Sequence, residues 1–485
     1  MLKTENFKKL ILSLIIFSLP FLEFLKNNID EIDIIIGVSF YALIIILILV
    51  LLFFAYLLNF FFKKINFYDS FLIIVIFNWF IFKHNLLNIF IKNIFELNKI
   101  TNEFSSEITL LILIVLSVIT SIFIYNKKEF LFRFIYIFFF LSFFYNFSQV
   151  IFKEKNIEVS SSNKENIIYF EDRIKTEKSN IYFFILDAMQ PIDAFEKYYD
   201  INLQKNLKAF EQKNYNYYYN TSNLYDNTTH GLSAIFYLDE IFTKDNKLKN
   251  KAKILYPTLL RDNFKSDLIY NLDNLGYEFK WIGNFFAYCP KFNLRYCLNQ
   301  NQNKLIDTYL YINFFRQTPI IQSIINFGYI INFDFNRYFF FKLNDGMGRL
   351  VKHLSENKNI KKPSFYFVHH MSPHWPYITN KDCSYKSFPG EKNYEGYKSA
   401  YLCVLNKILE TIEYIEKNDP NSFVVFQSDH SWQMSKTREE KKLIFNLLKV
   451  RDDCGIDPNI NLNNVNTLRL ILSCITGSDV EFIRR

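Results

Sequence analysis

Charged residues are scarce in this chain of 485 residues, and no block of basic residues occurs in it. Charged residues make up 21% of the sequence and apolar residues 50%, a balance that excludes a disordered protein or a long coiled coil. The formal charge is +8, from 56 basic and 48 acidic residues, and the excess is spread along the chain. Proteins that bind nucleic acid gather their basic residues on one face or in one segment. The sequence therefore excludes that function class.

Cysteine is absent from the first 288 residues, and no Cys-x-x-Cys pair is present, so nothing indicates a zinc finger. The six cysteines are Cys289, Cys297, Cys383, Cys403, Cys454 and Cys474. Their restriction to the C-terminal part is typical of a domain in an oxidising compartment. Cys289 and Cys297 flank a short loop (CPKFNLRYC), and we predict a disulfide between them, with free buried thiols as the alternative.

The N-terminal third is dominated by long apolar runs. A helix needs about 20 apolar residues to cross a bilayer. We predict about five spans, at residues 10–25, 34–62, 67–82, 108–125 and 134–152. The segment 67–82 is short and contains Asp69. No small-residue cleavage site follows the first segment, which predicts a retained anchor rather than a removed signal peptide.

The basic residues that flank these segments predict an orientation. They lie before the first segment, after the second and between the fourth and fifth, and are Lys3, Lys8, Lys9, Lys63, Lys64, Lys127, Lys128 and Arg133. Because cytoplasmic loops carry an excess of Lys and Arg, we expect a cytoplasmic N-terminus. Five spans then place the residues after 153 on the periplasmic or extracellular side of the cytoplasmic membrane.

The rest of the chain has the pattern of an α/β domain. We predict a transmembrane helical domain at 1–153, a polar linker at 154–180 and a globular domain at 181–485. Apolar runs predict strands at 181–187, 278–283, 364–370 and 422–429, and helical patterns lie at 262–276, 397–417 and 466–475. Strands that alternate with helices predict a mostly parallel central sheet covered by helices.

Three of these strands end in residues able to bind a metal. The first ends in Asp187, the third in His369 and His370, and the last in Asp429 and His430, while His374 follows shortly after the third. Ligands of open α/β sheets bind outside the carboxyl ends of the strands. A distant Asp together with an Asp-His pair is a plausible set of oxygen and nitrogen ligands for one divalent cation.

A fourth segment, NTTHGLSAIFY (227–237), predicts a helix capped by Asn227. A hydroxyl at its start lies beside unpaired backbone N–H groups, which favour an anionic substrate. Thr228 or Thr229 is therefore a candidate nucleophile, which a metal would activate. The alternative is that Thr228 and Thr229 only cap the helix.

The order of four motifs resembles the sulfatase-like branch of the alkaline phosphatase superfamily, especially its membrane-anchored members. The motifs are IYFFILDAM (181–189), TTHGLSAIF (228–236), PSFYFVHHMSPHWPY (363–377) and VVFQSDHSW (424–432). The helical segment NNVNTLRLIL (463–472) resembles a late helix of some membrane-bound members. The predicted architecture, about five spans before an external α/β domain, also resembles lipoteichoic acid synthases and lipid A phosphoethanolamine transferases.

The resemblance implies a role for individual residues. Asp187, Thr228, Asp429 and His430 match ligands of one divalent cation, Zn or Mn rather than Ca or Mg. Thr228 matches the nucleophile, because Leu232 and Ile235 follow it four and seven residues later, as in the family pattern. His374 matches a contact of the transferred group, and His369 an earlier catalytic histidine of the same strand. The implied reaction is a transfer of a phosphoethanolamine-like or phosphoglycerol-like group, or hydrolysis, through a covalent Thr ester. A membrane lipid donor, a surface glycan acceptor, or both are the implied partners.

Some residues depart from the family pattern. Ser431 stands where Gly is usual, Gly231 where Ser is frequent, and the tract after Trp432 lacks a second histidine expected in phosphoethanolamine transferases. Because Thr cannot mature to formylglycine, phosphoryl-type transfer is favoured over sulfuric ester hydrolysis. The alternatives are a sulfuric ester hydrolase and a catalytically inactive protein that binds envelope glycans.

Overall fold

The computed structural model contains two compact units, an N-terminal group of helices and a C-terminal α/β unit. The residues that it describes are 4–28, 34–61, 66–82, 112, 115, 129–152, 168–174, 178–223, 225–240, 255–256, 258–261, 266–283, 345–357, 362–375, 377–390, 394–432, 437, 440–451, 454, 460, 462–479 and 481–483.

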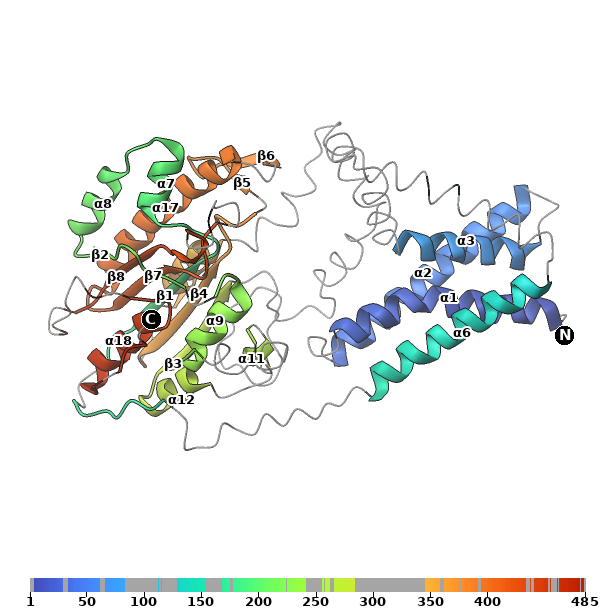
Figure 1. The fold of residues 1–485 in the computed structure, drawn as a ribbon, viewed down its shortest axis with the longest axis horizontal. Coiled ribbons are helices and arrows are strands. Elements are labelled where there is room, and N and C mark those ends of the chain that lie inside the picture. The colour runs from blue at the N-terminus through green and yellow to red at the C-terminus, as the bar shows by residue number, and fades with distance from the viewer. Residues whose placement is uncertain are drawn as a thin grey trace. The chain divides into compact units, whose positions relative to one another are not determined.

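The N-terminal unit consists, within these residues, of four helices (Figure 1). They are α1 (Thr4–Asn28), α2 (Ile34–Phe61), α3 (Phe67–Phe82) and α6 (Glu129–Phe152). Helix α1 packs against α3 and α6, and α2 packs against α3. Buried apolar side chains such as Leu12, Ile16 and Phe71 form the contact between them.

Two of these helices contain a stretch that is long and apolar enough to cross a membrane. The stretches are Ile44–Phe61 in α2 and Arg133–Ile151 in α6, and few of their side chains are buried. Phe67–Phe80 in α3 is a shorter apolar stretch. The predicted span 108–125 lies outside the described residues except for residues 112 and 115. Five spans therefore stay a prediction.

Asp69, the charged residue of the predicted span at 67–82, is paired. It lies in the first turn of α3, and its Oδ1 is 2.7 Å from Nζ of Lys9 on α1. Both side chains are largely buried. A charge in an apolar helix bundle is tolerated when an opposite charge compensates it, so this pair explains how α3 accommodates an acidic residue.

The C-terminal unit is built on a six-stranded sheet with the order β2-β8-β7-β1-β4-β3. Its strands are β1 (Ile181–Leu186), β2 (Asn216–Tyr217), β3 (Glu278–Gly283), β4 (Ser364–His370), β7 (Phe423–Ser428) and β8 (Asn446–Lys449). Strands β7, β1, β4 and β3 are parallel, whereas β8 and β2 add antiparallel pairs at one edge. The prediction of a mostly parallel sheet is confirmed.

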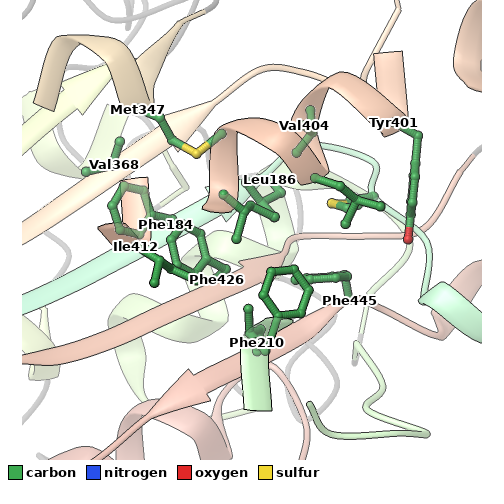
Figure 2. Packing of buried hydrophobic residues seen from close by; sticks show 14 of the residues in the cluster. Phe184, Leu186, Phe210, Met347, Val368, Tyr401, Val404, Ile412, Phe426 and Phe445 are labelled. Carbon is green, nitrogen blue, oxygen red and sulfur yellow. The ribbon is translucent and has the colours of Figure 1, made fainter. Parts of the chain in front are cut away.

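Helices cover both faces of this sheet (Figure 1). On one face lie α9 (Thr228–Tyr237), α11 (Thr258–Arg261), α12 (Asp267–Asn274) and α18 (Asn466–Thr476). On the other lie α7 (Ile192–Tyr199), α8 (Gln204–Glu211), α16 (Gly346–Glu356) and α17 (Tyr394–Asn418). Alternate residues of β1 point to opposite layers, with Phe183 in the first core and Phe184 in the second. Figure 2 shows the second core around Phe184, Leu186 and Phe426.

The predicted strands and helices of the globular part are present with small changes of their ends. Strands β3 and β4 have the predicted bounds, and β1 and β7 end one residue earlier than predicted. Helix α12 begins at Asp267, after an N-cap formed by Ser266, because the Ser266 hydroxyl accepts a hydrogen bond from the Ile269 amide. The predicted start at Asp262 lies outside the described residues.

Part of the segment predicted as a polar linker packs on the globular unit. Phe170 is buried, and its amide donates to Oδ1 of Asn271. The Ile168 amide donates to Oδ2 of Asp267 in the same helix. The described residues 168–174 therefore belong to the globular unit, because an aromatic side chain within the polar tract is buried there.

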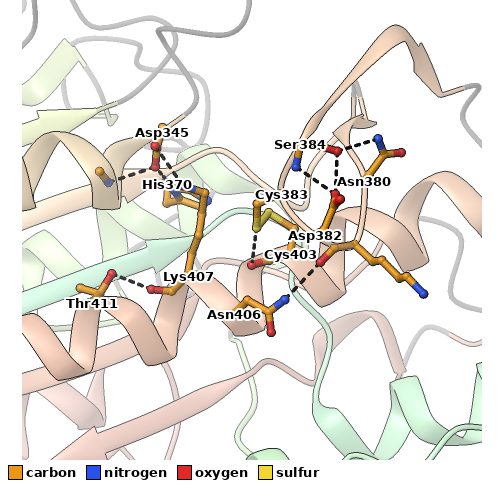
Figure 3. Close-up of a disulfide and its surroundings, with 12 residues drawn as sticks. Asp345, His370, Asn380, Asp382, Cys383, Ser384, Cys403, Asn406, Lys407 and Thr411 are labelled. Carbon is orange, nitrogen blue, oxygen red and sulfur yellow. Dashed lines mark hydrogen bonds and ion pairs between the residues drawn. A yellow bond between two sulfur atoms is a disulfide. The ribbon is translucent and has the colours of Figure 1, made fainter.

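Within the described residues, two disulfides cross-link the globular unit, Cys383–Cys403 and Cys454–Cys474. The first joins the turn between β5 (Tyr377–Thr379) and β6 (Tyr385–Gly390) to α17 (Figure 3). The sequence analysis did not identify either pair. The predicted Cys289–Cys297 pair lies outside the described residues.

Gly283 ends β3 in a crowded position. Its φ is 81°, and a Cβ atom there would overlap the carbonyl oxygen of His369 on β4. Gly276 has a similar φ of 78°, with no atom within 4 Å of such a Cβ. A comparison of the two glycines therefore separates two contributions to the free energy of unfolding, the left-handed backbone conformation and the steric clash of a Cβ atom.

We expect Gly276→Ala to lower the free energy of unfolding by roughly 1–2 kcal/mol, the usual cost of a left-handed conformation. Gly283→Ala should lower it by about 3 kcal/mol or more, because the clash with His369 adds to that cost. Denaturant unfolding of the purified protein measures both values. Equal losses in the two variants would contradict the close approach of β3 to β4.

Candidate metal centre

Three predicted metal ligands meet at the carboxyl edge of the sheet. Asp187 follows β1, and Asp429 and His430 follow β7. Because β1 and β7 are parallel neighbours with Leu186 opposite Ser428, the residues that follow them lie side by side. One ligand atom of each side chain lies within 4.8 Å of the other two, and all three side chains are buried.

In each of the two carboxylates, one oxygen accepts hydrogen bonds from the protein and the other oxygen accepts none from the described residues. Asp429 Oδ1 accepts from the backbone amides of Ala188 at 3.1 Å and His430 at 2.9 Å. Asp187 Oδ2 lies 3.1 Å from Nε2 of His369. The remaining oxygens, Asp187 Oδ1 and Asp429 Oδ2, are buried and have no hydrogen-bond partner among the described residues. Such buried acceptors are costly unless a cation or a donor satisfies them.

His430 directs a lone pair at these two oxygens. Its Nδ1 lies 2.7 Å from the carbonyl oxygen of Ser431 and therefore carries the hydrogen. Its Nε2 lies 3.6 Å from both Asp187 Oδ1 and Asp429 Oδ2, too far for a hydrogen bond. Two carboxylate oxygens and one imidazole nitrogen thus converge, and this donor set fits a divalent cation such as Zn²⁺ or Mn²⁺.

The electrostatics favour an ionised Asp187 at this edge. Burial alone would raise the pKa of Asp187, but His374, His369 and His430 outweigh it and lower the pKa to about 2. Burial alone would lower the pKa of His430, but Asp429 and Asp187 raise it above its ordinary value. The site therefore attracts positive charge, whether a proton or a metal ion.

The backbone after β1 is adapted to this arrangement. Ala188 has a φ of 61°, in the left-handed region that a residue with a side chain rarely adopts. In this conformation its amide donates to Asp429, and its carbonyl oxygen accepts from the hydroxyl of Tyr397 on α17 at 2.9 Å. Unfavourable backbone conformations of this kind cluster at functional sites.

His369 lies next to Asp187 and is completely buried. Its Nε2 bonds to Asp187, and its Nδ1 lies 3.1 Å from the hydroxyl of Tyr256. The structure thus places this predicted catalytic histidine against a candidate ligand. The sequence analysis missed Tyr256, because it lies in no recognised motif and tyrosine is abundant throughout the chain.

His374 lies on the open side of the centre. Its ring centroid is 6.4 Å from that of His430, and its side chain is partly exposed. Its Nδ1 bonds to the carbonyl oxygen of Trp375, which leaves Nε2 available to exchange a proton. This position suits the predicted contact with a transferred group or a leaving oxygen.

His370 points to the other face of the sheet from His369. Its Nδ1 is 3.7 Å from Oδ1 of Asp345, whose Oδ2 pairs with Lys407 at 3.0 Å (Figure 3). Burial lowers the pKa of His370 to about 4, against the opposing effect of Asp345. It is therefore a neutral, buried residue, in agreement with a structural role.

Helix α9, which begins at Thr228, approaches the same edge through Gly231. Asn227 caps the helix, because its Oδ1 accepts from the His230 amide at 3.0 Å. Gly231 lies against β7: a Cβ there would be 3.0 Å from the carbonyl oxygen of Asp429 and 2.7 Å from Nδ2 of Asn223. This close approach explains why Gly occupies a position where the family pattern often has Ser.

Ser431, where Gly is usual, is also buried, and its hydroxyl has no hydrogen-bond partner in the part of the chain that the structure describes. Its presence does not separate the three converging side chains. Most of the tract after Trp432, where a second histidine was expected, lies outside the described residues.

Several solved structures have a similar arrangement of elements. The zinc complex of the periplasmic domain of EcEptC from Escherichia coli has 17% identity and a TM-score of 0.41, with 64% of this chain and 85% of that chain covered. The soluble domain of lipooligosaccharide phosphoethanolamine transferase A from Neisseria meningitidis has 13% identity and a TM-score of 0.39, with 64% and 90% covered. The putative sulfatase yidJ from Bacteroides fragilis has 13% identity and a TM-score of 0.37, with 60% and 73% covered.

No family model matches the sequence, and no curated protein matches it.

We expect the protein to bind Zn²⁺ or Mn²⁺ and Asp429→Asn to abolish that binding, because the variant loses a negative ligand. A ligand present at 100 times its dissociation constant stabilises a protein by about 2.7 kcal/mol. Thermal unfolding with and without metal should therefore show a shift for the wild type and none for the variant. Without metal, Asp429→Asn should unfold at a higher temperature than the wild type, because one of two adjacent buried charges is removed.

Asp419→Asn is the matched control. Asp419 accepts hydrogen bonds from Asn180 and Tyr182, away from the centre. This variant should keep the metal-dependent shift. If metal raised the unfolding temperature of Asp429→Asn as much as that of the wild type, the proposed site would be ruled out.

Proposed function

We propose that the chain is a membrane-anchored member of the sulfatase-like branch of the alkaline phosphatase superfamily and an enzyme of phosphoryl-type transfer. One observation carries this proposal: Asp187 Oδ1, Asp429 Oδ2 and His430 Nε2 converge, buried and without hydrogen bonds to one another. This donor set fits one divalent cation, and we propose Zn²⁺ or Mn²⁺. Such an ion would act as a Lewis acid and lower the pKa of a bound hydroxyl.

Thr228 is the proposed nucleophile. Gly231 of α9 approaches the carbonyl oxygen of Asp429. Residues three positions apart share a helix face, whereas residues two positions apart do not. Thr228 therefore lies on the face that approaches Asp429, and Thr229 lies on another. The contact of Gly231 thus supports Thr228 over Thr229.

The residues around Thr228 would bind an anionic group. The start of α9 favours negative charge near Thr228, because the helix dipole has its positive end there and the backbone N–H groups of the first turn point toward it. His374 can approach the same group from the open side through Nε2. Preorganised donors of this kind supply much of the stabilisation in phosphoryl transfer.

The proposed reaction has two steps. Thr228 Oγ1 loses its proton to solvent and attacks the phosphorus atom, while the bond to the leaving oxygen breaks. His374 Nε2 gives a proton to that oxygen. An acceptor hydroxyl or water then attacks the phosphorus of the Thr228 ester and transfers its own proton to His374, and Thr228 regains a proton. Asp187, Asp429 and His430 keep their positions throughout.

We propose that the donor is a membrane lipid and that the acceptor is a lipid, a surface glycan or water. The apolar stretches of α2 and α6 support anchoring in the cytoplasmic membrane. The two disulfides support a globular unit on the periplasmic or extracellular side.

A catalytically inactive glycan-binding protein is less well supported. Its basis in the sequence is Ser431, and yet Asp187, Asp429 and His430 converge beside that residue. Less than about half an equivalent of bound Zn or Mn in the purified protein would favour it. A sulfuric ester hydrolase that depends on formylglycine is disfavoured, because Thr cannot form it.

Thr228→Ala should abolish the covalent intermediate, because the attacking oxygen is removed, while leaving metal bound by the three remaining ligands. Thr229→Ala is the matched control and should form the intermediate. The measurement is mass spectrometry of the peptide with residues 228–236 after incubation with phosphatidylethanolamine and phosphatidylglycerol vesicles. An adduct on Thr228→Ala would refute this nucleophile.

The orientation can be tested with two single cysteines at exposed positions. Lys352→Cys, on α16, should react with a membrane-impermeant maleimide in intact cells, because the globular unit is expected outside. Lys8→Cys, on α1, should react only after permeabilisation. The reverse pattern would place the globular unit in the cytosol and exclude a reaction with outer-leaflet substrates.

A further inference from the structure

Tyr256 joins two parts of the candidate centre that come from distant segments of the chain. Its hydroxyl lies 3.1 Å from Nδ1 of His369, which bonds to Asp187. Its backbone amide donates to the hydroxyl of Ser233 on α9 at 2.7 Å. One residue thus contacts both the support of a candidate ligand and the helix that carries Thr228.

The hydrogen bonds that link Tyr256, His369 and Asp187 have a direction that Asp187 sets. An ionised Asp187 can only accept, so His369 Nε2 carries the hydrogen and donates to it. In the neutral ring Nδ1 is then an acceptor, and the hydroxyl of Tyr256 donates to it. The tyrosine hydroxyl therefore selects the tautomer of His369 that suits Asp187.

The second chain leads to the first turn of α9. The Ser233 hydroxyl accepts from Tyr256 and donates to the carbonyl oxygen of Thr229. Because Thr229 follows Thr228, this chain holds the turn that carries the proposed nucleophile. The helix is thereby attached to the same residue that orients His369.

The ring of Tyr256 is fixed by packing. Its side chain is 2% exposed. It stacks on Phe236 of α9 with centroids 6.0 Å apart and contacts Trp281 and Phe367 edge to face. A phenylalanine ring would keep these contacts, so removal of the hydroxyl alone separates hydrogen bonding from packing.

We propose that Tyr256 is a positioning residue of the metal centre, which fixes His369 against Asp187 through its hydroxyl and holds the first turn of α9 through its amide. The inference rests on the proposed function, since it requires that Asp187 bind the ion. Mutation of a residue that hydrogen-bonds to a metal ligand, or that orients such a residue, typically lowers metal affinity by about 10–100-fold. Without the hydroxyl, Nδ1 of His369 loses its donor, and the ring can take the tautomer or orientation that leaves Asp187 unsupported.

The test compares two tyrosine-to-phenylalanine variants of the full chain in detergent. Tyr256→Phe removes the hydroxyl bonded to His369, whereas Tyr277→Phe removes a buried hydroxyl bonded to the carbonyl oxygen of Ser179. Titration with Zn²⁺ or Mn²⁺ gives the dissociation constants. Tyr256→Phe should weaken binding about 10-fold or more, and Tyr277→Phe should leave it unchanged within about 2-fold. Thermal unfolding without metal should shift by a similar amount in both.

A double-mutant cycle tests whether the hydroxyl acts through His369. The amide nitrogen of a glutamine in His369→Gln can donate to Asp187 without choosing a tautomer. In this background Tyr256→Phe should weaken metal binding less than about 2-fold, because coupled residues are not additive.

The outcomes separate this inference from the proposed function. A wild type that binds no metal refutes the proposed function. A wild type that binds metal while Tyr256→Phe binds it equally well refutes the role of Tyr256 alone. Two further results are an equal weakening of metal binding by Tyr256→Phe in the wild-type and His369→Gln backgrounds, and a weakening by Tyr277→Phe as large as that by Tyr256→Phe. Either result would mean general destabilisation and would refute the role of Tyr256.

Discussion

The repulsion between two buried carboxylates is the constraint on which the centre depends. Asp187 and Asp429 lie side by side at the end of adjacent strands, where little water can screen their charges. The surrounding residues offset this cost. Backbone amides satisfy one oxygen of Asp429, His369 satisfies one of Asp187, and the left-handed backbone of Ala188 serves the first of these contacts. The two remaining oxygens face His430 and mark the place proposed for a cation.

Much of this arrangement could be predicted because it depends on few facts. Continuous apolar runs mark buried parallel strands, and parallel strands end at one edge. The residues after β1 and β7 had to be neighbours once those strands paired. The antiparallel strands β2 and β8 and the hairpin of β5 and β6 were not predicted, since they are short and have no long apolar run. The charge pattern also could not indicate that Asp69 is paired with Lys9.

The contacts around the centre were harder to predict, because they join side chains that are far apart in the chain. Tyr256 has no motif, and only the fold places it between α9 and His369. The two observed disulfides likewise depend on which loops meet. Gly231 seemed a departure from a pattern in sequence, whereas in the structure it permits α9 to approach Asp429. That approach also supports Thr228 over Thr229 in the proposed reaction, whereas composition and capping treat the two threonines alike.

The consecutive histidines of β4 face opposite layers, one toward Asp187 and the other toward Asp345. Because side chains alternate along a strand, inserting one residue before Val368 within β4 would move His369 to the layer of Asp345 and bring Val368 to the position beside Asp187. The imidazole beside Asp187 would then be replaced by a neighbour with another side chain, while the apolar residues of the strand changed layers as well. Length variation among related chains should therefore be confined to the loops on either side of this strand.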